Sequence, residues 1–190
     1  MLRKWTKQQS VSMSVPTEQN ILITGRPGVG KTTLLCALSR ELCAERPTGF
    51  YTREIRERGK RRGFELIGLD SGRLTLAHTN SAHGPRVGKY KVDLPGFEAF
   101  LDLLLPPRED AGLVLIDEIG KMECLSPKFN RFVERVLDSP TPLIASVAAK
   151  GAGFINAVKQ RSDVRLVEVT EHNRDSLADE LRRSIASLLQ

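Results

Sequence analysis

The hydrophobic positions along this chain change their period from segment to segment, and the changes predict alternating strands and helices. Short continuous apolar runs are typical of strands buried in a parallel sheet, whereas apolar residues every three or four positions indicate helices. The predicted strands are 21–23, 50–55, 63–69, 73–78, 87–94, 113–116, 143–147 and 164–169. The predicted helices begin at residue 31 and stop before 46–49, and then cover 97–105, 126–137, 154–161 and 175–189. This alternation predicts an α/β fold, a three-layer sandwich around a mostly parallel central sheet.

Residues 53–94 break the alternation of strand and helix. Apolar positions alternate on both sides of the turn Asp70-Ser71-Gly72, which indicates an antiparallel β-hairpin inserted into the parallel core. Residues 20–190, with this insertion included, are predicted to form a single domain, since the chain is long enough for one full core. Residues 1–19 are polar, contain Pro16 and show no period, so we predict a flexible N-terminal extension.

The segment 20–33 combines a strand, a glycine-rich loop and the start of a helix. Gly25-x4-Gly30-Lys31-Thr32 is the Walker A or P-loop pattern, in the strand–loop–helix context that this pattern requires. Backbone N–H groups at a helix N-terminus can wrap a triphosphate, and glycines let the backbone approach phosphate oxygens. Lys31 is expected on the β- and γ-phosphates and the Thr32 hydroxyl on Mg²⁺. The predicted nucleotide-binding residues of this loop are Gly25, Arg26, Pro27, Gly28, Val29, Gly30, Lys31, Thr32 and Thr33.

Two carboxylates follow the apolar strand 113–116, which is the Walker B form. Ligands of open α/β sheets bind at the carboxyl ends of the strands, so Walker A and Walker B are expected at the same edge. Asp117 is predicted to hold Mg²⁺ through a water molecule. Glu118 is suited to accept a hydrogen bond from an attacking water and orient it. An acid in this place favours hydrolysis over transfer to another acceptor.

Composition and charge exclude some classes of protein and leave one alternative open. No apolar run approaches the ~18–20 residues of a membrane span. Three cysteines without metal-ligand spacing indicate buried free thiols in a reducing cytoplasm. The net charge is +6, with a basic group at residues 53, 56, 58 and 60–62. That group could bind nucleic acid, but glutamates interleave it and aromatic residues do not, which favours a solvated hairpin tip.

Six motifs together resemble the small nucleoside-triphosphatase family known as cancer-related nucleoside triphosphatase in animals and thermophile nucleoside-triphosphate phosphatase in microbes. They are Gly-Arg-Pro-Gly-Val-Gly-Lys-Thr-Thr (25–33), Gly-Phe-Tyr-Thr-Arg-Glu-Ile-Arg (49–56), Arg-Arg-Gly-Phe (61–64), Arg-Val-Gly-Lys-Tyr-Lys-Val-Asp (86–93), Ile-Asp-Glu-Ile-Gly-Lys-Met-Glu (116–123) and Thr-x-x-Asn-Arg-Asp (170–175). The resemblance implies a RecA/AAA-like core in a monomer. It also implies Mg²⁺-dependent hydrolysis of ATP, GTP, CTP and UTP to diphosphate and phosphate, with loose base selectivity. The extension 1–19 and the segment 145–151 depart from the family pattern.

Further positive charge on the γ-phosphate would lower the barrier to transfer. Lys121, three residues after Glu118, is the first candidate, and Arg86 and Arg174 follow. Arg174 also follows the last strand, where it is expected to contact the nucleotide.

Two other functions stay open at this point. One is a kinase that transfers the γ-phosphoryl group to a small acceptor, with an acceptor-binding lid in residues 53–94. The other is a nucleotide-operated switch or nucleic-acid partner that uses the basic segment 53–62, although a guanine-specific Asn-Lys-x-Asp motif is absent from the sequence.

Overall fold

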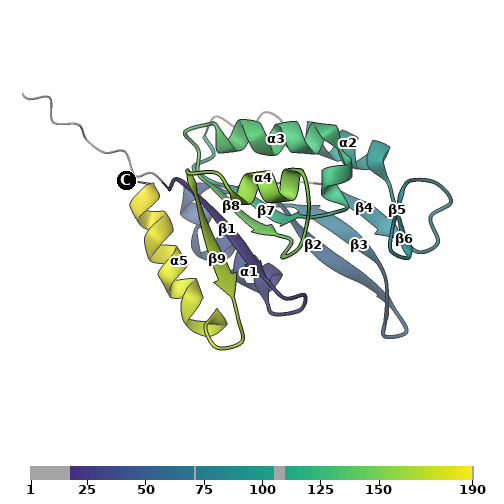
Figure 1. Cartoon of the computed structure of the whole chain (residues 1–190), viewed down its shortest axis with the longest axis horizontal. Coiled ribbons are helices and arrows are strands. Elements are labelled where there is room, and N and C mark those ends of the chain that lie inside the picture. The colour runs from purple at the N-terminus through teal and green to yellow at the C-terminus, as the bar shows by residue number, and fades with distance from the viewer. Residues whose placement is uncertain (1–17, 71, 105–109, 190) are drawn as a thin grey trace, which may run out of the picture.

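The computed structural model describes residues 18–70, 72–104 and 110–189, and in them nine strands form one sheet (Figure 1). One half of the sheet is parallel, in the spatial order β2-β7-β8-β1-β9. These strands are β1 (Asn20–Gly25), β2 (Thr48–Glu57), β7 (Val114–Ile119), β8 (Leu143–Val147) and β9 (Val164–Val169). The Walker A strand β1 and the Walker B strand β7 are therefore not neighbours, because β8 lies between them. The α/β fold with a mostly parallel sheet is confirmed.

The other half of the sheet is antiparallel and continues from β2 without a break. It runs β2-β3-β4-β6-β5, with β3 (Lys60–Gly68), β4 (Arg73–His78), β5 (Arg86–Val87) and β6 (Tyr90–Val92). β2 belongs to both halves, since Thr48 to Phe50 pair with β7 and Phe50 to Glu57 pair with β3. The predicted insertion is thus an extension of the central sheet. Figure 1 shows the β2–β3 hairpin extending beyond the carboxyl ends of the parallel strands.

The single strand predicted over 87–94 is wrong. The segment holds the two short strands β5 and β6, in which Val87 pairs with Tyr90 across a two-residue turn. Gly88 has a φ of +60° there, the conformation that the tight turn of a hairpin requires. Leu94 begins a helix, because Asp93 accepts a hydrogen bond from the Gly96 N–H at 3.0 Å and caps that helix.

Helices cover both faces of the sheet, as the three-layer prediction requires (Figure 1). On one face lie α1 (Lys31–Glu41) and α5 (Arg174–Leu188), and on the other α2 (Leu94–Asp102), α3 (Pro127–Leu137) and α4 (Phe154–Lys159). Alternate residues of β1 separate the two cores: Ile21 and Ile23 pack with α1 and α5, and Leu22 packs with the other face. Two 3₁₀ turns, η1 (Cys43–Glu45) and η2 (Glu123–Leu125), follow α1 and β7.

Several boundaries and side chains differ from the sequence-based expectations. α2 ends at Asp102, and Leu105, the last residue of the predicted helix, lies outside the described residues. Residues 1–17 of the predicted extension also lie outside them. Gln19, at the end of that extension, donates to the Ser139 carbonyl at 3.3 Å. All three cysteines are free, but Cys43 is exposed and the other two are half-buried, so the prediction that they are buried is wrong.

Charges of the β2–β3 hairpin pair within the hairpin. Arg53 lies 2.5 Å from Glu65, Arg61 2.7 Å from Glu54, and Arg62 3.0 Å from Glu57. Exposed pairs of this kind contribute little stability. They do place a carboxylate beside several of the basic residues that could otherwise face a phosphate backbone.

No helix in the part of the chain that the structure describes is long and apolar enough to cross a bilayer.

Candidate active site

The sequence-predicted residues meet at the carboxyl ends of β1, β7 and β8. The glycine-rich loop leaves β1 at Gly25, Asp117 and Glu118 lie near the end of β7, and Ser146 lies near the end of β8. The register between β7 and β8 shifts between Ile116 and Ile119, so the two acidic residues sit where the ladder is irregular. Walker A and Walker B therefore share one edge of the sheet, as predicted.

The loop between β1 and α1 adopts backbone conformations that need glycine. Gly28 and Gly30 have φ values of +80° and +114°, and Gly30 precedes the first residue of α1. A Cβ at Gly25 would lie 2.5 Å from the Val169 carbonyl oxygen, so a side chain there would push β9 away. Lys31 donates to the carbonyls of Gly25 at 3.1 Å and Arg26 at 3.4 Å. Its ammonium group thus lies beside the start of the loop in which the phosphates are expected to bind.

Asp117 is buried, with 3% of its surface exposed, and both of its carboxylate oxygens accept hydrogen bonds. Thr32 donates its hydroxyl to Oδ2 at 2.7 Å, and Ser146 donates its hydroxyl to Oδ1 at 2.6 Å. Thr52, from β2, donates its N–H to Oδ2 at 3.4 Å and its hydroxyl to the Asp117 carbonyl. Three segments of the chain, which carry Thr32, Thr52 and Ser146, therefore hold this carboxylate in one place.

The Thr32–Asp117 contact is the observation on which a metal can be judged. Thr32 spends its proton on Asp117, so the lone pairs of its hydroxyl oxygen stay available, and hard oxygen ligands of this kind suit Mg²⁺. No cluster of three or more His, Cys, Asp or Glu side chains within residues 18–70, 72–104 and 110–189 could hold a metal by itself. Such a sparse donor set fits Mg²⁺, which usually takes its other ligands from substrate phosphates and water.

Glu118 is half-buried, and burial raises the pKa of its carboxyl group. The positive charges of Lys31 and Lys159 oppose this rise in pKa, whereas the charge of Asp117 adds to it. Partial burial beside a like charge makes Glu118 a better proton acceptor than an exposed glutamate, as a water-activating group needs.

A second buried carboxyl, Glu123, lies next to Glu118. A Cβ at Gly120 would lie 2.8 Å from Glu123 Oε2 and 3.5 Å from Glu118 Cδ, so the two acids both lie close to that glycine. Burial, with smaller contributions from the charges of Glu118 and Asp117, raises the pKa of Glu123 to about 8. With a pKa of about 8, Glu123 holds a proton at neutral pH.

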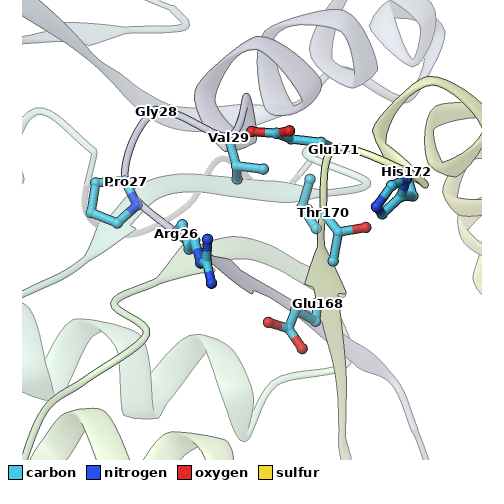
Figure 2. Close-up of a pocket in the computed structure, with 9 residues that line it drawn as sticks. Arg26, Pro27, Gly28, Val29, Glu168, Thr170, Glu171 and His172 are labelled. Carbon is cyan, nitrogen blue, oxygen red and sulfur yellow. The ribbon is translucent and has the colours of Figure 1, made fainter.

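Two hollows flank the glycine-rich loop. The first, of about 410 Å³, is lined by Arg26, Pro27, Gly28, Val29 and the segment 168–172. Figure 2 shows Arg26 and His172 on opposite sides of this hollow, with Thr170 between them. The second, of about 390 Å³, lies between α1 and α5 and is lined by Gly30, Thr33 and Arg174 among others. Residues 26–30 and Thr33 thus line a hollow, and Thr32 binds Asp117. Gly25 packs against Val169, and Lys31 donates to loop carbonyls.

The predicted γ-phosphate cations lie in three different places. Lys121 is exposed on the turn after β7, close in sequence to Glu118. Arg174 begins α5 and lines the second hollow. Arg86 lies on β5, and β6, β4, β3 and β2 separate it from β7, so the strand order does not bring it to the site.

Sequence analysis missed four residues of this region. None of them belongs to the Walker patterns. Thr52 and Ser146 donate hydrogen bonds to Asp117, Glu123 lies near Glu118, and the charge of Lys159 acts on Glu118. Ser146 carried a usable signal, since it is a lone hydroxyl within an apolar strand that ends at the ligand edge. Glu123 carried a second signal, since it is a charged residue in a turn whose neighbouring residues are mostly apolar.

Comparison with known proteins gives this site a family. The family model described as "NTPase" matches residues 20–182. The chain belongs to this NTPase family.

Individual members of the family resemble the chain over most of its length. "Nucleoside-triphosphatase THEP1" of Thermotoga sp. (strain RQ2) is 46% identical over 162 residues, which cover 85% of this chain and 92% of that protein. The crystal structure of THEP1 from Aquifex aeolicus superposes with a TM-score of 0.77 at 30% identity, covering 85% of this chain and 96% of that one. The solution structure of a human cancer-related nucleoside triphosphatase gives a TM-score of 0.75 at 32% identity, covering 89% and 98%. The resemblance that the six motifs indicated is confirmed.

Proposed function

We propose that this protein is a Mg²⁺-dependent nucleoside-triphosphatase that hydrolyses ATP, GTP, CTP and UTP to the diphosphate and phosphate. The observation that carries the proposal is the Thr32–Asp117 hydrogen bond of 2.7 Å, which joins Walker A to Walker B directly beside Glu118. The names of its relatives support the reaction class. We further propose that it acts as a monomer, as the family resemblance implies, and in the cytoplasm, as its free cysteines indicate.

Each residue of the site has a distinct role in this proposal. Backbone N–H groups of the loop 25–33, to which Pro27 contributes none, bind the phosphates, and Lys31 leaves the two loop carbonyls to lie on the β- and γ-phosphates. Thr32 and, through a water molecule, Asp117 would hold Mg²⁺, which supplies positive charge against the phosphates. Glu118 accepts a hydrogen bond from the attacking water and aligns it with the γ-phosphorus.

Base selectivity is proposed to be loose because of what lines the first hollow. The ring of His172 and the guanidinium group of Arg26 offer flat surfaces on which any base can stack (Figure 2). Arg174, in the second hollow beside Thr33, is proposed to contact the nucleotide between its phosphates and its base.

A panel of nucleoside triphosphates tests the proposal. We expect phosphate release from ATP, GTP, CTP and UTP with kcat/KM values within about tenfold of each other, since a stacked base without a dedicated hydrogen-bond partner contributes little selectivity. Release should stop when EDTA removes divalent cations and return when Mg²⁺ is added. The measurement is continuous detection of phosphate without any acceptor, and no release from any of the four nucleotides would overturn the proposal.

The structure gives the kinase alternative less support than the sequence did. A kinase needs a lid or pocket for its acceptor, and residues 53–94 were the candidate for it. Apart from residue 71, this segment forms strands and turns of the central sheet, with Leu66, Leu76 and Val92 fully buried in the core. A segment anchored in this way is a wall beside the site rather than a closing lid.

Ser146 offers a test of how Asp117 is held. Ser146→Ala removes the hydroxyl that donates to Oδ1, so the Mg²⁺ concentration for half-maximal activity should rise about 10–100-fold, because partners behind a metal ligand tune its affinity to that extent. The measurement is a Mg²⁺ titration of phosphate release. Ser146→Thr, which keeps the hydroxyl, is the matched control and should remain within about threefold of the wild type. An unchanged titration in the alanine variant would show that Thr32 and Thr52 hold Asp117 without Ser146.

A further inference from the structure

A lysine that no motif predicted occupies the end of β8 in the way that Lys31 occupies the end of β1. Lys159 is the last residue of α4, and its Nζ donates to the carbonyls of Ala148 at 2.5 Å and Ala149 at 3.1 Å. Lys31 likewise donates to two carbonyls of the loop that follows its own strand. β1 and β8 are neighbours in the sheet. Two ammonium groups therefore rest on loop carbonyls at adjacent strand ends.

The loop under Lys159 is joined to the strand that carries Glu118. The Ala148 N–H donates to the carbonyl of Ile119, the residue after Glu118, at 3.2 Å. Burial lowers the pKa of Lys159, and the charge of Glu118 opposes that change. Burial raises the pKa of Glu118, and the charge of Lys159 opposes that rise. Lys31 acts on Glu118 in the same sense. The charges of Lys31, at the start of α1, and Lys159, at the end of α4, therefore both act on Glu118.

The space beside Glu118 is where the attacking water and the γ-phosphate have to meet if the proposed function is right. In the transition state negative charge spreads over the γ-phosphoryl oxygens, and a cation placed there in advance stabilises it. Lys31 reaches this group from the β1 side and is shared with the β-phosphate. The β8 side has room for a second cation. Of the candidates predicted for that role, Lys121 is exposed on the turn after β7, Arg86 lies on the far strand β5, and Arg174 lines the hollow between α1 and α5.

We propose that Lys159 is this second cation, a catalytic residue that exchanges the carbonyls of Ala148 and Ala149 for a γ-phosphoryl oxygen. Water forms the new bond to phosphorus, and the bond from phosphorus to the β–γ bridging oxygen breaks, leaving its electron pair on the diphosphate. One proton of the water passes by way of Glu118 to the released phosphate. Lys159 gives up no proton and acts through its charge alone. This inference rests on the proposed hydrolase function.

Replacing Lys159 by methionine tests the role with little change in side-chain length. In Lys159→Met we expect kcat to fall about 100-fold or more, as when one charge-stabilising donor is removed, while KM changes by less than about threefold. Affinity for the diphosphate with aluminium fluoride should fall by a similar factor, and affinity for a non-hydrolysable triphosphate analogue should not. Lys159→Arg keeps the charge and should recover at least a tenth of wild-type kcat.

Two matched variants and a stability measurement separate this role from the alternatives. Lys150 is exposed on the same β8–α4 loop, and Lys150→Met should retain wild-type kcat. Equal losses of affinity for the transition-state mimic and the triphosphate analogue, together with a lower Tm, would overturn the proposal. They would show that Lys159 only stabilises the β8–α4 loop through its two carbonyl contacts. An unchanged kcat in Lys159→Met, or a large loss in Lys121→Met instead, would also overturn it.

The same assay keeps the failure of this inference apart from failure of the proposed function. Wild-type turnover with an undiminished Lys159→Met variant rejects the role of Lys159 alone. Absence of phosphate release from the wild-type protein rejects both, because there is then no hydrolytic transition state for Lys159 to stabilise.

Discussion

Replacing Glu118 by glutamine should lower kcat for ATP hydrolysis about 10²–10⁴-fold while the protein still binds Mg²⁺·ATP, since a positioned general base contributes that much. Glutamine has nearly the same shape as glutamate, but it cannot take a proton from water. Phosphate release under single-turnover conditions measures the chemical step, and titration with a fluorescent ATP analogue measures binding. We expect slow phosphate release together with unchanged affinity for the nucleotide.

Glu134→Gln provides the matched control, because Glu134 is an exposed residue of α3. It should behave as the wild type in both measurements. If Glu118→Gln turned over at the wild-type rate, water would be activated elsewhere, and Glu123, the neighbouring buried acid, would be the next residue to replace.

Replacing Lys31 by methionine should weaken binding of Mg²⁺·ATP about 100-fold, the upper range for hydrogen bonds to a charged group, and should leave little turnover at any accessible substrate concentration. Lys31 is proposed to contact the β- and γ-phosphates, so the loss should be large for ATP, smaller for ADP and near zero for AMP. Isothermal titration with the three nucleotides measures this gradient.

The comparison variant for Lys31 is Lys60→Met, since Lys60 is an exposed lysine at the tip of the β2–β3 hairpin. It should bind all three nucleotides as the wild type does. Equal weakening of ATP, ADP and AMP in Lys31→Met would indicate that the loop itself had collapsed. In that case the contact between Lys31 and the β- and γ-phosphates would not be supported.

The parts of the site that the sequence predicted are those built from contiguous residues. A phosphate-binding loop uses the backbone of one short segment, so its glycines, Lys31 and Thr32 must occur at fixed spacing, and a pattern can find them. Asp117 and Glu118 follow from the end of a buried strand by the same reasoning. The alternation of strands and helices gave the layers of the fold, because buried parallel strands and amphipathic helices have different apolar periods.

The residues that the sequence did not reveal come from segments that only the fold brings together. Thr52 reaches Asp117 because β2 pairs with β7, and Ser146 reaches it because β8 lies between β1 and β7. Lys159 reaches the β8 loop across a helix of six residues. The β5–β6 hairpin was missed because strands of two and three residues show too little alternation to be recognised.

The position of β1 has a consequence for the order of events during synthesis. β1 is the first strand of the sheet to leave the ribosome, but both of its neighbours, β8 and β9, come from the last third of the chain. Gly25 is packed against Val169, so the walls of the nucleotide site are incomplete until residue 169 has emerged. A nascent chain that already carries the whole Walker A segment therefore cannot use nucleotide binding to guide its own folding until β9 has been synthesised.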